Sequence, residues 1–174
     1  MSQLSIKTGR LLLRRWRDDD VEPFAAMCSD PEVMRYIGSG ATRTRAQAQA
    51  SIDAYERGWE ENGFGLFAVE RLEDSKFLGF TGLTEPTFLP KIMPAVEIGW
   101  RFARQSWGNG YASEAALAAL DFGLRKRGLS EIVGVYQAEN HASGRIMQKL
   151  GMHFDRETID PTCGRLVRLY RTLK

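Results

Sequence analysis

The stretch Gln105-Ser106-Trp107-Gly108-Asn109-Gly110-Tyr111-Ala112 decides the fold, because it joins a predicted strand at residues 96–102 to a predicted helix at residues 109–127. Gly108 and Gly110 stand where the backbone must turn tightly and bring its N–H groups close to a neighbour. The first N–H groups of the helix have no partners within it, and its dipole is positive at this end. A strand, a glycine turn and a helix N-terminus together are typical of a pyrophosphate-binding site. A plain helix cap with a glycine-rich entry would give the same short pattern.

This turn matches neither of the two common nucleotide-binding motifs. A dinucleotide fingerprint needs a third glycine where Ser113 stands, and a hairpin precedes the turn instead of a βαβ unit. The chain has no Gly-Lys-Ser/Thr triplet, which excludes a P-loop. The helix behind the turn has a face of small residues that lets it lie close to a sheet: Ala112, Ala115, Ala116, Ala119 and Gly123.

Outward from this turn the chain alternates between helical and strand patterns. Apolar residues at a period of about 3.6 predict helices, and short alternating runs predict strands. The predicted helices are 18–27, whose N-cap and first-turn charge come from Asp18, Asp19 and Asp20, then 44–61, 109–127 and 141–150, with a further turn or short helix at Asp30-Pro31. The predicted strands are 10–16, 65–70, 77–84, 96–102, 131–137, 152–158 and 165–172. The loop at residues 85–94 holds three prolines and cannot be regular.

This order of elements predicts an α/β (α+β) fold class. We expect a single mixed, partly antiparallel central sheet of about seven strands, flanked by about four helices. The chain has 174 residues, of which 43% are hydrophobic, so it can bury the core of one domain. We therefore expect a single domain over residues 1–174.

The composition excludes several classes of protein. Lys and Arg number 24 and Asp and Glu number 22, with no basic run, so we expect neither a nucleic-acid nor a membrane partner. The two cysteines, Cys28 and Cys163, lack the paired spacing of a metal site, so we expect no metal. Reduced thiols and the absence of a signal-peptide pattern at the N-terminus predict a cytoplasmic protein.

Glu97 is the first candidate for chemistry outside the glycine turn. It stands in the middle of the predicted strand 96–102, on the face opposite Val96, Ile98 and Trp100. Carboxylates are depleted in strands. Glu97 is therefore either solvated on an open face or placed as a base.

Asn140 and Ser143 form a second candidate pair. Asn140 stands at the N-cap of the predicted helix 141–150, and Ser143 lies on the same stripe as Ile146, Met147 and Leu150. The two residues either brace the first turn of the helix or point an amide and a hydroxyl into a cleft between neighbouring strands.

Together these residues resemble the GNAT acetyltransferases, and within them the RimJ/RimL type, which acetylates the N-termini of ribosomal proteins. The Trp-Gly-x-Gly-Tyr-Ala-x-Glu motif of this branch stands at residues 107–114. Its Asn-x-x-Ser helix start stands at Asn140 and Ser143, and its Lys-Leu-Gly ending at residues 149–151. Residues 10–14 and 77–83 also fit the branch, so the resemblance covers nearly the whole chain.

The resemblance implies an N-acetyltransferase that moves an acetyl group from acetyl-CoA to a primary amine by direct attack in a ternary complex. The GNAT sheet would be splayed in the middle, between strands 96–102 and 131–137, with the pantetheine arm between them. Backbone N–H groups around residues 107–112 would bind the pyrophosphate, and Asn140 would bind the pantetheine arm. The implied cofactor-binding residues are Ile98, Gly99, Trp100, Gln105, Trp107, Gly108, Asn109, Gly110, Tyr111, Ala112, Asn140 and Ser143.

The implied catalytic residues are Glu97 and Ser143. Many GNAT enzymes have a tyrosine as general acid seven residues after the asparagine, but Met147 stands there and cannot donate a proton. Ser143, near the leaving thiolate, is the alternative acid. Deprotonating the amine at pH 7 costs about 1.4 kcal/mol for an α-amine and about 4.6 kcal/mol for a lysine. Glu97, acting through water, would suffice for an α-amine, and Glu85 is the next candidate base. A backbone N–H near Ile98 or Gly99 would meet the oxyanion.

The sequence leaves the acceptor open between a protein N-terminus and a small-molecule amine. We expect residues 34–44 and the loop 85–94 to shape its site. Phe88, Leu89, Ile92 and Met93 in this loop form an acceptor wall, a dimer contact or local packing. A monomer and a homodimer fit the sequence equally well. The alternatives outside this class are a non-catalytic acyl-CoA sensor and a protein that binds a nucleotide at the same turn.

Overall fold

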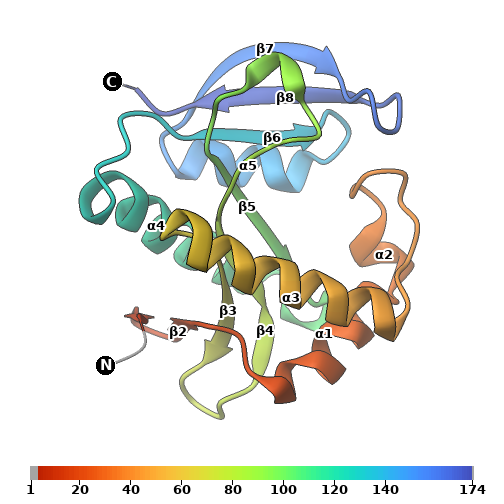
Figure 1. Cartoon of the computed structure of the whole chain (residues 1–174), viewed down its shortest axis with the longest axis vertical. Helices are drawn as coiled ribbons and strands as arrows, with labels where there is room; N and C mark the ends of the chain where they lie inside the picture. The colour runs from red at the N-terminus through yellow and green to blue at the C-terminus, as the bar shows by residue number, and fades with distance from the viewer. Residues whose placement is uncertain (1–3, 174) are drawn as a thin grey trace.

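The computed structural model describes residues 4–173, which form one eight-stranded sheet with helices on both faces (Figure 1). The strand order is β1-β2-β3-β4-β5-β6-β8-β7. Every neighbouring pair is antiparallel except β5 and β6, which are parallel. The strands are β1 (Ile6–Lys7), β2 (Leu11–Arg14), β3 (Leu66–Arg71), β4 (Phe77–Thr84), β5 (Glu97–Phe102), β6 (Val133–Gln137), β7 (His153–Ile159) and β8 (Leu166–Arg171). The α-helices are α1 (Val21–Cys28), α2 (Pro31–Met34), α3 (Arg45–Asn62), α4 (Tyr111–Asp121) and α5 (His141–Lys149).

The predicted mixed, partly antiparallel sheet is confirmed, with small differences in its elements. Residues 4–173 hold eight strands where about seven were expected, and five α-helices where about four were expected. The two-residue strand β1 was not predicted, because it is too short for a periodic pattern to reveal. The fifth helix, α2, is the turn or short helix expected at Asp30-Pro31. The helix expected at 109–127 divides into α4 and a π-helical segment, Phe122–Lys126. No helix within residues 4–173 combines the length and apolar character needed to cross a membrane.

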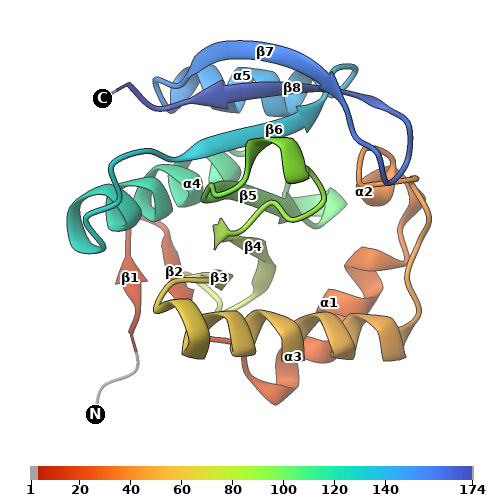
Figure 2. The ribbon, with the colours of Figure 1, turned by 45° about the horizontal axis from the view of Figure 1, so that its top comes forward.

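Two hydrophobic clusters fill the two faces of the sheet. Figure 2 shows the helices that cover these faces. Helices α4 and α5 cover one face, where Ala115, Ala116 and Ala119 are fully buried, so the predicted small-residue face does pack against the sheet. Helices α1, α2 and most of α3 cover the other face, around Trp16, Phe24 and Phe80. At Gly123, a Cβ would lie 2.6 Å from Ile132 and 2.7 Å from Leu83, which explains why that position carries no side chain.

The parallel pair β5 and β6 is joined only where the two strands begin. Glu97 and Val133 are the one pair of residues in register, and the N–H of Val133 donates to the carbonyl of Val96 at 2.8 Å. Beyond this point β5 turns away from β6, as Figures 1 and 2 show. The sheet therefore opens at its centre, and within residues 4–173 the facing edges of β5 and β6 beyond Glu97 have no ladder partner.

A buried ion network ties β2 to the start of α1. Both terminal nitrogens of Arg14 donate to the carboxylate of Asp20 at 2.8 Å, and its Nε donates to Glu70 at 2.8 Å. The side chains of Arg14, Asp20 and Glu70 are only 8%, 3% and 10% exposed. The three residues Asp18, Asp19 and Asp20 were expected to supply the N-cap and the first-turn charge of this helix. Asp20 is the N-cap of α1, but its carboxylate accepts no hydrogen bond from that helix and instead bonds Arg14 and the N–H of Arg17.

Replacing Asp20 should destabilise the fold far more than replacing its neighbour Asp19. Asp20→Ala leaves the buried guanidinium of Arg14 without half of its countercharge, which should lower the free energy of unfolding by about 3 kcal/mol. Asp19→Ala removes the same charge from the same turn at an exposed position, and should change stability by less than about 0.5 kcal/mol. Urea denaturation of both variants measures the difference. Equal effects would show that the network contributes nothing beyond surface charge.

Candidate active site

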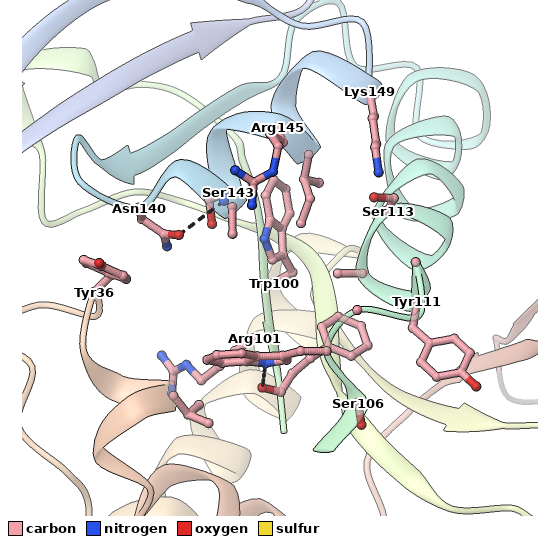
Figure 3. A pocket seen from close by; sticks show the side chains of 18 of the residues that line it. Tyr36, Trp100, Arg101, Ser106, Tyr111, Ser113, Asn140, Ser143, Arg145 and Lys149 are labelled. Carbon is pink, nitrogen blue, oxygen red and sulfur yellow. Dashed lines mark hydrogen bonds between the residues drawn. The ribbon is translucent and has the colours of Figure 1, made fainter. Parts of the chain in front are cut away.

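A pocket of about 510 Å³ lies where the sheet opens, between the glycine turn, the start of α5 and helix α2 (Figure 3). Its polar and charged lining comes from four separate segments of the chain, which the fold brings together. The residues that line it are Glu32, Val33, Tyr36, Ile37, Trp100, Arg101, Phe102, Ser106, Trp107, Gly108, Gly110, Tyr111, Ala112, Ser113, Asn140, Ala142, Ser143, Arg145, Ile146 and Lys149.

The pocket passes through the sheet from one face to the other. Trp100 and Arg101 are consecutive residues of β5, so their side chains point to opposite faces, yet both line the pocket. Trp100 packs against the cluster under α4 and α5. Arg101 lies over Phe80 of the cluster under α1 and α2. Only the gap between β5 and β6 allows one pocket to reach both faces, so a ligand on one face can meet a ligand on the other there.

The glycine turn presents free backbone N–H groups to the pocket. Gly108 and Gly110 both have φ near +78°, in the left-handed region that favours glycine. Gly110 is the N-cap of α4 and offers no side chain to cap it. Among the described residues, the N–H groups of Tyr111, Ala112 and Ser113 donate to no acceptor. Unpaired N–H groups at the positive end of a helix form a site for an anion such as a pyrophosphate.

The turn is braced from outside the pocket by residues that the sequence analysis did not single out. Arg10 donates to the carbonyl of Asn109 at 2.9 Å and to the carboxylate of Glu114 at 2.7 Å, and Thr8 donates to Glu114 at 2.6 Å. Burial raises the pKa of Glu114, but these hydrogen bonds outweigh it and hold the pKa below its ordinary value. The amide of Asn109 folds back onto the carbonyls of Ser106 and Trp107. The position of the turn is therefore fixed by the β1–β2 segment.

The start of α5 forms the opposite wall. The side-chain oxygen of Asn140 accepts a hydrogen bond from the N–H of Ser143 at 3.2 Å, as a helix cap does, and both residues also line the pocket (Figure 3). Both functions considered for this pair are thus compatible. Met147 is 1% exposed and packs under Gly134 in the core, so the position of the usual tyrosine acid does not face the pocket.

Arg145 and Lys149 are two lining cations that the sequence analysis missed. They stand one helical turn apart on α5. Figure 3 shows Lys149 near Ser113 of α4, and Arg145 beside Ser143 and above Trp100. Neither forms a salt bridge within the described part of the chain. Their spacing of four residues after an N-capped start was the signal that could have found them.

Glu97 lies at the point where β5 and β6 separate, beside the pocket and not among its lining residues. The residue is part-buried, but its carboxyl group is enclosed by protein. This burial raises the pKa of Glu97 to about 8, although the backbone N–H of Val135 acts in the opposite direction. A carboxyl with this pKa can accept a proton reversibly near neutral pH.

The pocket brings together most of the residues predicted for the site. Trp100, Trp107, Gly108, Gly110, Tyr111, Ala112, Asn140 and Ser143 line it. Glu97, Ile98, Gly99, Gln105 and Asn109 do not. Ile98 is fully buried in the core and can reach the pocket only through its backbone, and the exposed side chain of Gln105 borders a separate cavity beside Arg14.

Of the two segments expected to shape the acceptor site, only the first reaches the pocket. Tyr36 and Ile37 line it, whereas the loop 85–94 does not, and Leu89 of that loop is buried locally at 2% exposure. Arg165 fixes the first segment by donating to the carbonyls of Arg35 and Ser39 at 2.9 and 2.7 Å. It also donates to Gln137 at 2.8 Å, so the segment is held at the end of β6. Among the described residues, no cluster of His, Cys, Asp and Glu is placed to hold a metal ion.

The chain is similar to known acetyltransferases in sequence and in fold. The acetyltransferase (GNAT) domain matches residues 10–153. The N-acetyltransferase YoaA of Bacillus subtilis is 31% identical over 146 residues, covering 84% of this chain and 81% of that protein. A GNAT-family acetyltransferase structure from Bacillus anthracis is 27% identical, with a TM-score of 0.81 over 98% of both chains. The structure of RimL, a ribosomal L7/L12 α-N-protein acetyltransferase, in complex with coenzyme A is alike in fold alone, at 12% identity and a TM-score of 0.78 over 98% of both chains. The match over residues 10–153 shows that this chain belongs to the GNAT family of acetyltransferases.

Proposed function

We propose that this protein transfers the acetyl group of acetyl-CoA to a primary amine. The observation that carries the proposal is the pocket that passes through the open sheet, with an uncapped helix N-terminus on one side and an enclosed carboxyl beside the gap. An anionic donor bound on the α4 and α5 face can meet an amine that enters from the α2 face. The reaction then needs only one proton acceptor and one means of stabilising the leaving thiolate.

The residues on the α4 and α5 face suit the donor. Three free N–H groups at the start of α4 would bind the pyrophosphate, and the ammonium of Lys149 and the guanidinium of Arg145 would add positive charge. The open edges of β5 and β6 have unpaired backbone groups that an extended amide chain such as pantetheine can bond. Acetyl-CoA supplies the activated acetyl group, and the residues of this face would hold it in position for the reaction.

Glu97 and Ser143 would handle the charges that develop during transfer. As the amine nitrogen forms its bond to the acetyl carbon, its proton passes to Glu97, directly or through water, and the bond to sulfur breaks. The hydroxyl of Ser143, at the start of α5, would donate to the departing thiolate. A backbone N–H of the unpaired part of β5, near Ile98 or Gly99, would meet the oxygen of the acetyl group.

A protein N-terminus or another α-amine is the acceptor that we favour. An α-amine requires less assistance than a lysine to lose its proton at neutral pH. The RimJ/RimL-type motifs at residues 107–114 and 140–151 point the same way. Such a reaction would take place in the cytoplasm, where acetyl-CoA and newly made N-termini occur together.

Turnover with acetyl-CoA tests the proposal directly. The protein should release the free thiol of CoA from acetyl-CoA in the presence of a suitable amine, chosen from N-terminal peptides, amino acids, polyamines and aminoglycosides. Acetyl-CoA and CoA should also raise the melting temperature, because they bind only the folded state. If binding occurs and no amine in the panel is acetylated, a sensor of acyl-CoA becomes the better description. If neither ligand binds, the assignment of the pocket is wrong.

A negative charge at the start of α4 should weaken acetyl-CoA binding without harming the fold. Ser113→Asp places a carboxylate in the first turn of α4. There it interacts favourably with the helix dipole, which stabilises the helix, but it repels a pyrophosphate. The Kd of acetyl-CoA should rise at least about 10-fold, or about 1.4 kcal/mol. Leu117→Asp is the matched control, because it adds the same charge one turn later at an exposed position outside the pocket. Calorimetric titration of both variants decides, and equal affinities would place the pyrophosphate elsewhere.

The pH dependence should identify Glu97 as the base. The carboxylate form increases as the pH rises through the Glu97 pKa of about 8, so the wild-type rate at saturating substrates should rise between pH 7 and pH 9. Glu97→Gln should lower the rate most near pH 8, and the rate of this variant should recover at higher pH, where the free amine needs no base.

Because the raised pKa favours the protonated form, Glu97 makes the fold less stable as the pH rises from about 4.5 to about 8. The melting temperature of Glu97→Gln minus that of the wild type should therefore increase as the pH rises over this range.

Ser143→Ala provides the contrast within the same experiment. A hydroxyl that acts only as negative charge develops on sulfur should affect the chemical step with little change in the Kd of acetyl-CoA, and with no shift of the pH profile. Full activity of Glu97→Gln at every pH would assign the base to another group or to bulk water. A shifted pH profile in Ser143→Ala would contradict the division of roles.

A further inference from the structure

Arg101 is a part-buried cation that lines the pocket and forms no salt bridge within residues 4–173. Its Nε is buried and has no hydrogen-bond partner within residues 4–173. One terminal nitrogen lies 3.6 Å from the sulfur of Cys28, and the guanidinium lies over the ring of Phe80 at 5.2 Å. Both are weak partners for a full positive charge. The one carboxylate that lines the pocket, Glu32, instead bonds Arg104 at 3.3 Å.

Arg14 is a buried arginine with a structural role, and its hydrogen-bond acceptors can be compared with those of Arg101. The guanidinium of Arg14 has two carboxylates and a backbone carbonyl as hydrogen-bond acceptors, at 2.8 to 3.1 Å. A guanidinium keeps its charge under all ordinary conditions, so burying one without an anion is costly. Arg101 therefore retains an unmet requirement for an anion, which a ligand in the pocket can meet.

The position of Arg101 separates it from the phosphates of acetyl-CoA. Those phosphates would lie on the α4 and α5 face, with Arg145, Lys149 and the start of α4. Arg101 points to the other face, toward α1 and α2. Figure 3 shows Arg101 and Tyr36 on one side of the pocket, and Lys149 and Ser113 on the other. The face of Arg101 is the one from which the amine would enter.

We infer that Arg101 is a specificity-determining residue that binds a carboxylate of the acceptor, so that the substrate is an amine that carries a carboxylate. This inference rests on the proposed function, because it takes the α2 face as the acceptor side. A guanidinium binds a carboxylate through two parallel hydrogen bonds, which fixes the orientation of the acceptor as well as its charge.

The surroundings of Arg101 fit a single negative charge better than a phosphate. Arg101 is one cation lying over Phe80, and the lining on its face of the pocket also holds the apolar Val33 and Ile37 and the carboxylate of Glu32. A phosphate dianion would leave part of its charge unmatched there. Glu97 and Arg101 lie on the same face of β5, and their backbones are about 13 Å apart. The carboxylate is therefore several bonds away from the reacting amine, as in an acidic residue near a peptide N-terminus.

Matched pairs of acceptors test the inference. Tripeptide amides with Glu or Gln, and with Asp or Asn, at the first, second or third position differ only in the negative charge, and free amino acids form a further arm. The wild type should acetylate at least one acidic acceptor with a kcat/KM at least about 10-fold above that of its neutral partner. Arg101→Gln should abolish this preference and leave the KM of acetyl-CoA unchanged. Arg101→Lys, which keeps the charge, should restore part of the preference.

The controls distinguish charge, fold and function. Arg125→Gln removes the same charge from an exposed site on the π-helical segment and should keep the preference. Melting temperatures show whether Arg101→Gln is folded. If no acceptor is acetylated, the proposed function fails, and the same pairs are then compared by their stabilisation of the CoA complex. Equal kcat/KM values of the wild type for the acidic and the neutral acceptors of every pair would overturn the inference. So would a preference that survives in Arg101→Gln, or an effect of this variant on the KM of acetyl-CoA alone.

Discussion

The separation of β5 from β6 is the constraint on which the rest of the site depends. A parallel pair normally continues its ladder for the length of both strands, but here one pair of residues, Glu97 and Val133, is in register. The lost hydrogen bonds leave backbone groups that must be satisfied by a ligand or by water. The same opening lets one pocket contact both faces of the sheet, which an unbroken sheet would prevent. A pocket that reaches both faces of the sheet thus follows from the early end of one ladder.

The charges of the molecule divide into those that the fold satisfies and those that it leaves free. Arg14 bonds both Asp20 and Glu70 in the core, and Arg17 also bonds Glu70. Glu114 is held by Thr8 and Arg10. The start of α4 and the guanidinium of Arg101 lack such partners, and both lie at the pocket. Unpaired polar groups reduce stability, so a fold retains them where a ligand compensates for them. Their shared location is an argument for function that does not depend on family resemblance.

Local sequence was sufficient for the parts of the site that rest on short-range rules. The glycine turn, the N-cap at Asn140 and the small-residue face of α4 each follow from a few neighbouring residues, and the structure shows all three. The contribution of Arg10 could not be predicted, because it contacts Glu114 across more than a hundred residues of chain. The face of Glu97 followed from strand alternation, but its enclosure depends on β6, which is far away in sequence. In the sequence Arg101 is one more strand residue, because the unpartnered state of its Nε within residues 4–173 depends on how α1 and α2 pack against β5.

The properties of Glu97 and Arg101 together favour an α-amine over a lysine as the acceptor. Proton transfer is most efficient when donor and acceptor have similar pKa values, and the pKa of Glu97, about 8, is close to that of an α-amine. Transfer from a lysine ammonium, with a pKa of about 10.4, would be uphill by about 3 kcal/mol. A carboxylate bound at Arg101 would hold the acceptor on the same face of β5 as Glu97 and bring the amine toward the gap in the sheet. The base would then receive its proton where the acetyl group is presented, and an amine without the carboxylate would reach that point less often.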